Sequence, residues 1–280
     1  MGWRLRIKHV TGFTYAGTAH ASYNEARMTP LTVPGQTTLF SQVECTPGAT
    51  TWRYVDYWGS QVTVFDLQRP HQQLRVTATS LVETAERTSI EGGLDWDALR
   101  SDSTVDRYAE ILAATTLTTI DAELAGVAAD LAEGLSPGQA ANAVAAWVQT
   151  NVEYVPGSTG VRTSAQEAWS LRKGVCQDIA HLTLGMLRCM GIPARYVSGY
   201  LYPSASGEVG DTIAGQSHAW VEWWCGDWTG FDPTNGVPVG LRHVIVAKGR
   251  DYADVTPLKG VYHGASSTGL GVTVDITRLA

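Results

Sequence analysis

Residues 174–200 read GVCQDIAHLTLGMLRCMGIPARYVSGY, a glycine-containing loop that runs directly into a predicted helix and then into a strand. Cys176 falls where the helix begins. Backbone N–H groups without helical partners and the positive end of the helix dipole both favour a thiolate there. Gly191 and Pro193 end the helix. Its apolar face has helical spacing and consists of Ile179, Leu182, Met186, Cys189 and Met190. The segment therefore predicts a largely buried helix with a reactive thiol at its accessible amino end.

A helix alone does not activate a cysteine. A thiol with the reference pKa of about 8.5 is only about 3% ionised at neutral pH. A helix dipole contributes roughly 0.3–2 kcal/mol, which moves a pKa by little more than one unit. A histidinium partner must supply the rest, and seven histidines compete for that role.

Six of the seven histidines are poor candidates. His181 follows Cys176 on the same helix but points about 140° away around its axis. The others are His9, His20 and His71, in a β-rich region where polar side chains usually face water, and His243 and His263, in late segments without a suggestive acidic partner.

His218 opens the predicted strand HAWVEWW, and the hairpin-like segment that follows brings Asp232 back beside it. Facing side chains on antiparallel strands lie about 4.5–5.5 Å apart, so a carboxylate can bond the second imidazole nitrogen. Pro233 keeps Asp232 extended and ends the strand. The order Cys176, His218, Asp232 has the logic of a thiol catalytic triad.

The composition is that of an ordinary globular protein, with 280 residues, 44% apolar and 17% charged. A net charge of -7 and the lack of a Lys/Arg run argue against nucleic acid or a membrane as partner, so we expect a small or peptide-like substrate. The start, MGWRLRIKHV, alternates like a strand and lacks a signal peptide's apolar run, and no apolar stretch approaches about 18 residues. A soluble, cytoplasmic protein is expected, with no prediction of its oligomeric state.

Cys45, Cys189 and Cys225 are interpreted as small buried residues in a reducing compartment, because the cysteines lack paired spacing. No calcium loop, zinc-type spacing or phosphate-cradling glycine loop is present in the sequence. We expect no metal ion and no cofactor.

Two domains are predicted, 1–92 and 93–280, with the boundary where the strand pattern breaks at Glu91 to Gly93. The first is β-rich and sandwich-like. The second begins with helices and ends with strands up to the end of the chain, so the fold class is α+β.

Two helix starts carry capping signals. Ser136 with Pro137 and Gln139 predicts one capping box, and Thr163 with Gln166 predicts another, whose helix Gly174 closes in a left-handed conformation.

The segments 174–201 and SHAWVEWWCGDWTGFDPTNG (217–236) resemble the transglutaminase-like cysteine-enzyme superfamily, in its bacterial branch with an N-terminal β domain. YNEARMTPLTVPGQ (23–36) resembles the N-terminal domain of that branch, and GRDYADVTPLKGVYHG (249–264) its C-terminal segment. The resemblance implies a papain-like core whose nucleophile helix packs on an antiparallel sheet. It also implies Cys176 as nucleophile, His218 as base and Asp232 as the residue that orients it.

By this resemblance the thiolate attacks an amide or other acyl carbon and forms a thioester acyl-enzyme, by protease-type hydrolysis or transglutaminase-type transamidation. The Cys176 N–H is one expected oxyanion donor; Trp147 and Tyr154 are candidates for the second. Two alternatives stay open: a non-catalytic binding or scaffold protein, and acyl transfer from a small thioester to an arylamine. The tryptophans near His218 are interpreted mainly as core, with one or two as possible cleft walls: Trp220, Trp223, Trp224 and Trp228.

Overall fold

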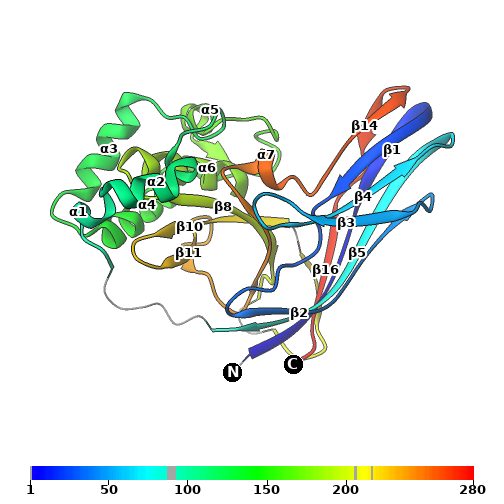
Figure 1. The fold of residues 1–280 in the computed structure, drawn as a ribbon, viewed down its shortest axis with the longest axis horizontal. Helices are drawn as coiled ribbons and strands as arrows, with labels where there is room; N and C mark the ends of the chain where they lie inside the picture. Colours follow the sequence, from blue (N-terminus) through cyan, green and yellow to red (C-terminus); the bar gives the residue numbers. More distant parts are fainter. Residues whose placement is uncertain (1, 87–92, 205–206, 216) are drawn as a thin grey trace.

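The computed structural model describes residues 2–86, 93–204, 207–215 and 217–280. A large curved sheet stands beside a second unit in which helices cover a smaller sheet (Figure 1). The predicted α+β class is confirmed. None of the described helices is long and apolar enough to span a membrane, and the cytoplasmic location stays a prediction.

The large sheet is a half-barrel of nine strands in the described residues, a single curved sheet and not two facing ones. Its path is β2-β5-β1-β16-β9, and β4, β14 and β15 also pair with β1, while β3 pairs with β4. The strands are β1 (Gly2–Ala26), β2 (Gln36–Thr46), β3 (Thr51–Val55), β4 (Gln61–Leu67), β5 (His71–Ala85), β9 (Thr212–Gly215), β14 (Leu258–Gly264), β15 (Ser267–Gly269) and β16 (Thr273–Arg278).

The strands at the end of the chain join this N-terminal sheet, although the sequence analysis places them in the core. The reason is the length of β1, which has room to pair with β5 along one edge and with β16, β15 and β14 along the other. The predicted boundary at residues 92 and 93 adjoins residues 87–92, which lie outside the described residues.

The core sheet has the order β12-β11-β10-β8-β13, and a short parallel pair, β6 and β7, lies beside it. Its strands are β8 (Ala194–Leu201), β10 (Ser217–Trp224), β11 (Trp228–Asp232), β12 (Val237–Pro238) and β13 (His243–Gly249); the pair is β6 (Glu153–Tyr154) and β7 (Lys173–Gly174). The helices are α1 (Trp96–Leu99), α2 (Asp102–Leu112), α3 (Ala122–Ala132), α4 (Pro137–Asn151), α5 (Ala165–Leu171), α6 (Cys176–Cys189) and α7 (Tyr252–Val255).

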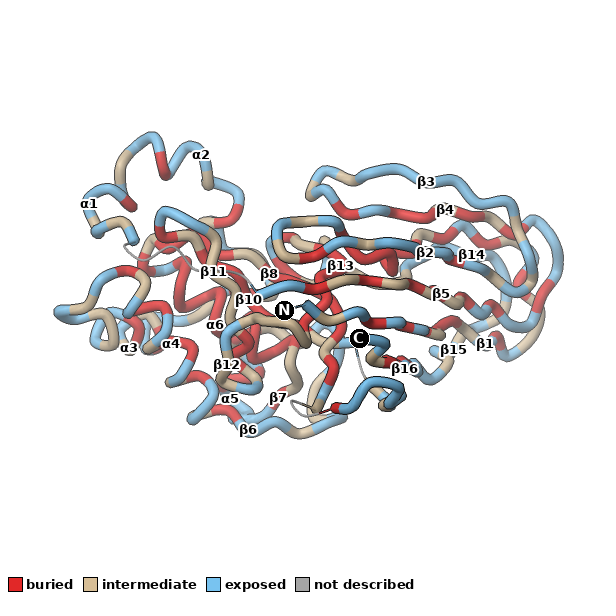
Figure 2. The backbone as a smooth tube through the Cα atoms, turned by 90° about the horizontal axis from the view of Figure 1, so that it is seen from below, coloured by how far each residue is buried: buried red, intermediate tan, exposed pale blue. Residues whose placement is uncertain are grey.

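Helix α6 is the centre of the core. It packs against β10 and β8 on one side and against α3, α4 and α5 on the other. Figure 2 shows it almost continuously buried, whereas β3 is exposed along its whole length. Surrounded in this way, α6 leaves only its ends accessible, as the sequence predicts.

The capping predictions are confirmed at one helix and displaced at another. At α4, the Gln139 side chain accepts the Ser136 N–H. At α5, the capping box is formed by Ser164 and Glu167, one residue later than the predicted pair. Arg172, not Gly174, adopts the left-handed conformation that ends α5.

Glu222 on β10 anchors a buried ion cluster at the end of the sheet remote from His218. Its carboxylate accepts from Arg195 Nε at 2.8 Å and from Lys248 Nζ at 2.8 Å. Burial raises the pKa of Glu222, but the two cations outweigh burial and lower it to about 2. The Arg195 guanidinium also stacks over the Trp228 ring at 3.6 Å.

We expect the Glu222→Gln variant to be less stable at pH 7, and the loss to disappear in acid. The folded-state pKa of about 2 lies below the ordinary value of 4.5. The stabilisation is therefore present above pH 4.5 and is lost as the pH falls through 2. It amounts to roughly 3 kcal/mol. Urea titrations at pH 7 and in acid measure this difference in the free energy of unfolding.

The exposed Arg4–Glu83 pair supplies the control: Glu83→Gln should change stability by less than about 1 kcal/mol. Equal effects of the two variants at pH 7 would contradict the prediction.

Candidate active site

Cys176 is the first residue of α6, and Val175 is its N-cap. The Asp178 carboxylate fixes this helix start, because its Oδ2 accepts the Val175 N–H at 2.8 Å and the Thr159 hydroxyl at 2.5 Å. A side chain at position 174 would collide with Asp178, since an added Cβ would lie 2.7 Å from the Asp178 Cβ. Gly174 is thus needed for close approach. Cys176 itself is half-buried.

His218 and Asp232 meet across the antiparallel pair β10 and β11. His218 Nε2 lies 2.7 Å from Asp232 Oδ2, so the other ring nitrogen, Nδ1, is free to face the thiol. Burial lowers the pKa of His218, but hydrogen bonds to Asp232 and then to Cys176 outweigh it and raise the pKa to about 9. His218 is therefore an imidazolium at neutral pH, between a thiol and a carboxylate. The structure brings together all three side chains that the sequence analysis selected.

Asp232 is fully buried and accepts hydrogen bonds at both oxygens. Oδ1 accepts the backbone N–H of Thr234 at 3.0 Å and of Asn235 at 3.2 Å. Oδ2 accepts the Asn235 side-chain amide at 2.7 Å, in addition to His218. Burial raises the pKa of Asp232, but hydrogen bonds from the side chains of His218, His243 and Asn235 hold it well below its usual range. The carboxylate stays ionised and fixed in orientation.

His243 is a functional candidate that the sequence analysis missed. Its Nε2 lies 3.3 Å from Asp232 Oδ2, although the sequence pattern offered it no acidic partner. The signal is not local, because β13 lies beyond β8 in the core sheet and His243 reaches the carboxylate only through the fold.

A cavity of about 420 Å³ opens beside His218. Among the residues that the structure describes, His218 and Tyr154 are the titratable residues that line it, and no described carboxylate, Lys or Arg does so. Two of its residues come from β9 of the N-terminal sheet. The lining is Tyr154, Leu201, Pro203, Ala214, Gly215, His218, Thr234 and Asn235.

The tryptophans of β10 and β11 do not line this cavity. Trp220 is fully buried and packs against both His218 and His243, with ring centroids 6.0 and 5.2 Å away. Trp223 is also buried, and Trp224 packs on Tyr108. The interpretation as core is confirmed for Trp220 and Trp223, whereas Trp224 and Trp228 are half-buried and Trp228 lines a separate cavity.

The other cysteines differ in exposure. Cys225 is buried, Cys45 is intermediate, and Cys189 is exposed, contrary to its interpretation as a buried residue. His181 is buried and accepts the Tyr252 N–H at 3.1 Å, so it serves the packing of α7 on α6. Within the part of the chain that the structure describes, no three His, Cys, Asp or Glu side chains are grouped to hold a metal ion, and metal independence stays a prediction.

Comparison with known proteins finds two family signatures in this chain, and one of them includes Cys176, His218 and Asp232. The signature of the transglutaminase-like superfamily matches residues 125–233, and that of the bacterial transglutaminase-like N-terminal region matches residues 5–83. The chain belongs to the transglutaminase-like superfamily. The superfamily match includes Cys176, His218 and Asp232, and ends one residue after Asp232.

Relatives of this transglutaminase-like protein extend over its whole length. An uncharacterized protein of Mycobacterium leprae is 46% identical, covering 99% of this chain and 100% of the relative. An uncharacterized protein of Mycobacterium tuberculosis is 29% identical, covering 98% of this chain and 92% of the relative. A crystal structure from Cytophaga hutchinsonii, described as a "Putative Cysteine Protease", has a TM-score of 0.80 at 21% identity, covering 100% of this chain and 92% of that one. This last likeness shows a shared fold.

Proposed function

We propose that this protein is a thiol-dependent enzyme that transfers the acyl group of a peptide or protein amide to water or to an amine. Cys176 is the nucleophile, His218 the acid and base, and Asp232 the residue that orients His218. The observation that carries the proposal is that His218 Nε2 lies 2.7 Å from Asp232 Oδ2, and that the interactions of His218 with Asp232 and then with Cys176 raise its pKa to about 9. In the resting site, an imidazolium beside the thiol stabilises the thiolate.

The first half-reaction forms a thioester. The Cys176 thiolate attacks the amide carbon, and the carbonyl electrons move onto oxygen. His218 then gives its Nδ1 proton to the departing nitrogen as the C–N bond breaks, which leaves an acyl-enzyme and a neutral imidazole. In the second half, the imidazole takes a proton from water or an amine, which attacks the thioester. The C–S bond breaks, and thiolate and imidazolium are restored.

Two donors are proposed for the oxyanion. The Cys176 N–H is at the first helical position, where no intrahelical acceptor is available. The Tyr154 hydroxyl is favoured over Trp147 as the second. Tyr154 lines the cavity with His218, and burial and then the charge of Cys176 raise the pKa of Tyr154. The Trp147 ring instead packs on Trp169 at 4.9 Å.

Apart from the catalytic His218, the described lining of the cavity carries no charged side chain, which supports an uncharged acyl group as substrate. A cysteine protease and a transglutaminase-type acyltransferase both fit this chemistry. The relationship to a structure described as a "Putative Cysteine Protease" supports the choice of amide bonds.

The test is a peptide library incubated with the protein in ¹⁸O-water together with an isotope-labelled primary amine. Hydrolysis places ¹⁸O in new carboxylates, and transfer places the labelled amine in new amides. Both products are expected to disappear in the Cys176→Ala variant. A library left unchanged relative to that variant would contradict an enzymatic role and favour a binding or scaffold protein.

A further inference from the structure

Asp232 has a second histidine partner. His243, at the start of β13, is buried, and its Nε2 lies 3.3 Å from Asp232 Oδ2. The Gly240 N–H points at His243 Nδ1 from 3.2 Å. An amide N–H can only donate, so Nδ1 is the acceptor and Nε2 carries the proton of the neutral ring. Burial lowers the pKa of His243, which keeps the ring neutral. His243 therefore donates a hydrogen bond to the carboxylate without adding charge.

The His243 ring is held on its other side by packing. It meets the buried Trp220 edge-on, with ring centroids 5.2 Å apart and planes 73° apart. Trp220 in turn packs against the His218 ring. A ring that is hydrogen-bonded at both nitrogens and packed against Trp220 has one orientation, so the bond that it donates limits rotation of the Asp232 carboxylate.

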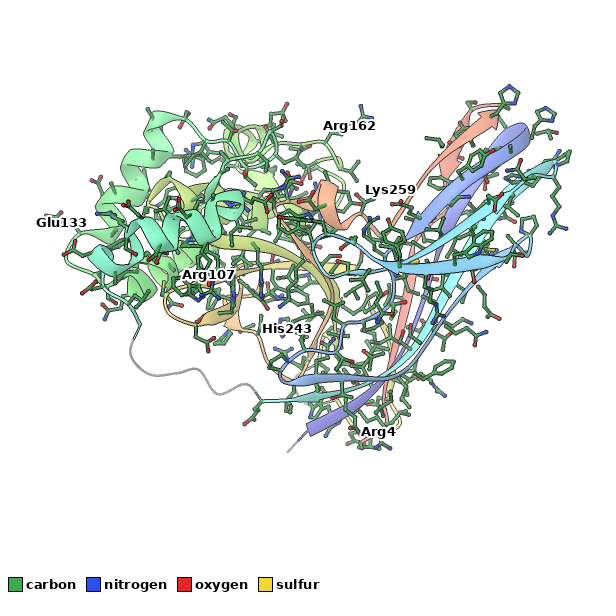
Figure 3. All side chains as sticks on the ribbon, viewed as in Figure 1. Arg4, Arg107, Glu133, Arg162, His243 and Lys259 are labelled. Atoms are coloured by element: carbon green, nitrogen blue, oxygen red, sulfur yellow. The ribbon has the colours of Figure 1, made fainter. Side chains whose placement is uncertain are left out.

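The N-terminal domain holds β13 in place. The buried Gln36 side chain mimics a neighbouring strand, because its Oε1 accepts the Ile245 N–H at 2.7 Å and its Nε2 donates to the Ile245 carbonyl at 2.8 Å. The Leu31 N–H donates to the same carbonyl at 3.0 Å. Ile245 lies two residues after His243, on the edge strand of the core sheet. Figure 3 places His243 where the core faces the N-terminal sheet.

We infer that His243 is a positioning residue for the Asp232 carboxylate, and that the N-terminal domain supports the active site by holding β13 through Gln36. The inference rests on the proposed function. The titratable and charged groups that face this carboxylate or His243 are His218 and Arg242, and Cys176 faces His218 on its other side. Asn235, which also donates to Asp232, is neutral.

The test is the pH dependence of Cys176 alkylation by iodoacetamide, with kcat and KM for a peptide amide that the wild type converts. The upper inflection of the alkylation profile reports deprotonation of His218, whose pKa is raised to about 9. His243→Phe keeps a ring against Trp220 and removes the donor. We expect the inflection to fall by about half a pH unit or more, and kcat to fall about tenfold with KM nearly unchanged. His243→Gln restores an N–H donor and should recover most of both effects.

Gln36→Leu should move the inflection in the same direction by a smaller amount. Its matched control is Val76→Ala, which creates a cavity in the apolar cluster of the N-terminal sheet, away from β13. That control should lower the thermal midpoint without moving the inflection. Circular dichroism establishes that each variant is folded.

An unchanged inflection in His243→Phe would overturn the inference. An upward shift of the inflection would overturn the inference too. It would mean that the hydrogen bond from His243 only weakens the effect of the Asp232 charge on the pKa of His218 and does not position the carboxylate. Failure of the proposed function is distinguishable: in that case wild-type Cys176 itself would not be alkylated faster than Cys189.

Discussion

Replacement of Cys176 by Ala is expected to abolish amide conversion, with kcat/KM reduced by about 10⁴-fold or more. The thiol forms the covalent bond to the acyl group, and no neighbouring side chain can replace it. Cys176 is half-buried at the amino end of α6, so the free energy of unfolding should change by less than about 1 kcal/mol. Product formation from a peptide that the wild type converts, measured with urea unfolding, checks both expectations.

The same helix supplies the control. Cys189 ends α6 and is exposed, so Cys189→Ala removes a thiol from the opposite end of the element. Its activity should match the wild type within about twofold. An active Cys176→Ala variant would contradict the assignment of the nucleophile. An inactive Cys189→Ala variant would show that removing either thiol from α6 abolishes activity, so the loss in Cys176→Ala would not identify the nucleophile.

Asp232→Asn is the second change with a large expected effect, about 10³ to 10⁴-fold in kcat. Asn is isosteric, and its oxygen can still accept the backbone N–H groups of Thr234 and Asn235. Its NH₂ group would then face His218 Nε2, where the carboxylate oxygen now lies. His218 would have to accept there and carry its proton on Nδ1, so the neutral imidazole could not take a proton from the attacking water or amine. Removal of the carboxylate also removes the charge that raises the pKa of His218.

Asp227→Asn is the matched control, because Asp227 is an exposed carboxylate next to the start of β11. It should leave kcat unchanged within about twofold. The pH profile of kcat/KM should move for Asp232→Asn alone. If Asp232→Asn retained more than about a tenth of the wild-type kcat, Asp232 would not be the orienting residue.

The sequence predicts those parts of the site that depend on local patterns. The start of α6 at Cys176 follows from the glycine-containing loop and the apolar periodicity. The pairing of His218 with Asp232 follows from two strands joined by a short turn. In both cases the deciding interactions are close in the chain.

Features that depend on distant segments could not be predicted. His243 reaches Asp232 only because β13 lies at the edge of the core sheet and is fixed at Ile245 by Gln36, which precedes Ile245 by 209 residues. Likewise, β16 alternates apolar and polar residues as any half-buried strand does, and nothing in it specifies β1 as its partner. The displaced cap at Ser164 is a different case: Thr163-Gln166 and Ser164-Glu167 both satisfy the capping-box pattern, so the sequence offers two adjacent starts.

The most direct test of the central claim is the rate of iodoacetamide alkylation of each cysteine at pH 6, mapped by mass spectrometry. An ordinary thiol is only about 0.3% ionised at that pH. Because the His218 imidazolium favours ionisation of a neighbouring thiol, Cys176 is predicted to react about a hundredfold faster than Cys189. Cys189 is exposed, so a slow reaction there would not result from lack of access to the reagent. Equal rates for Cys176 and Cys189 would contradict the account.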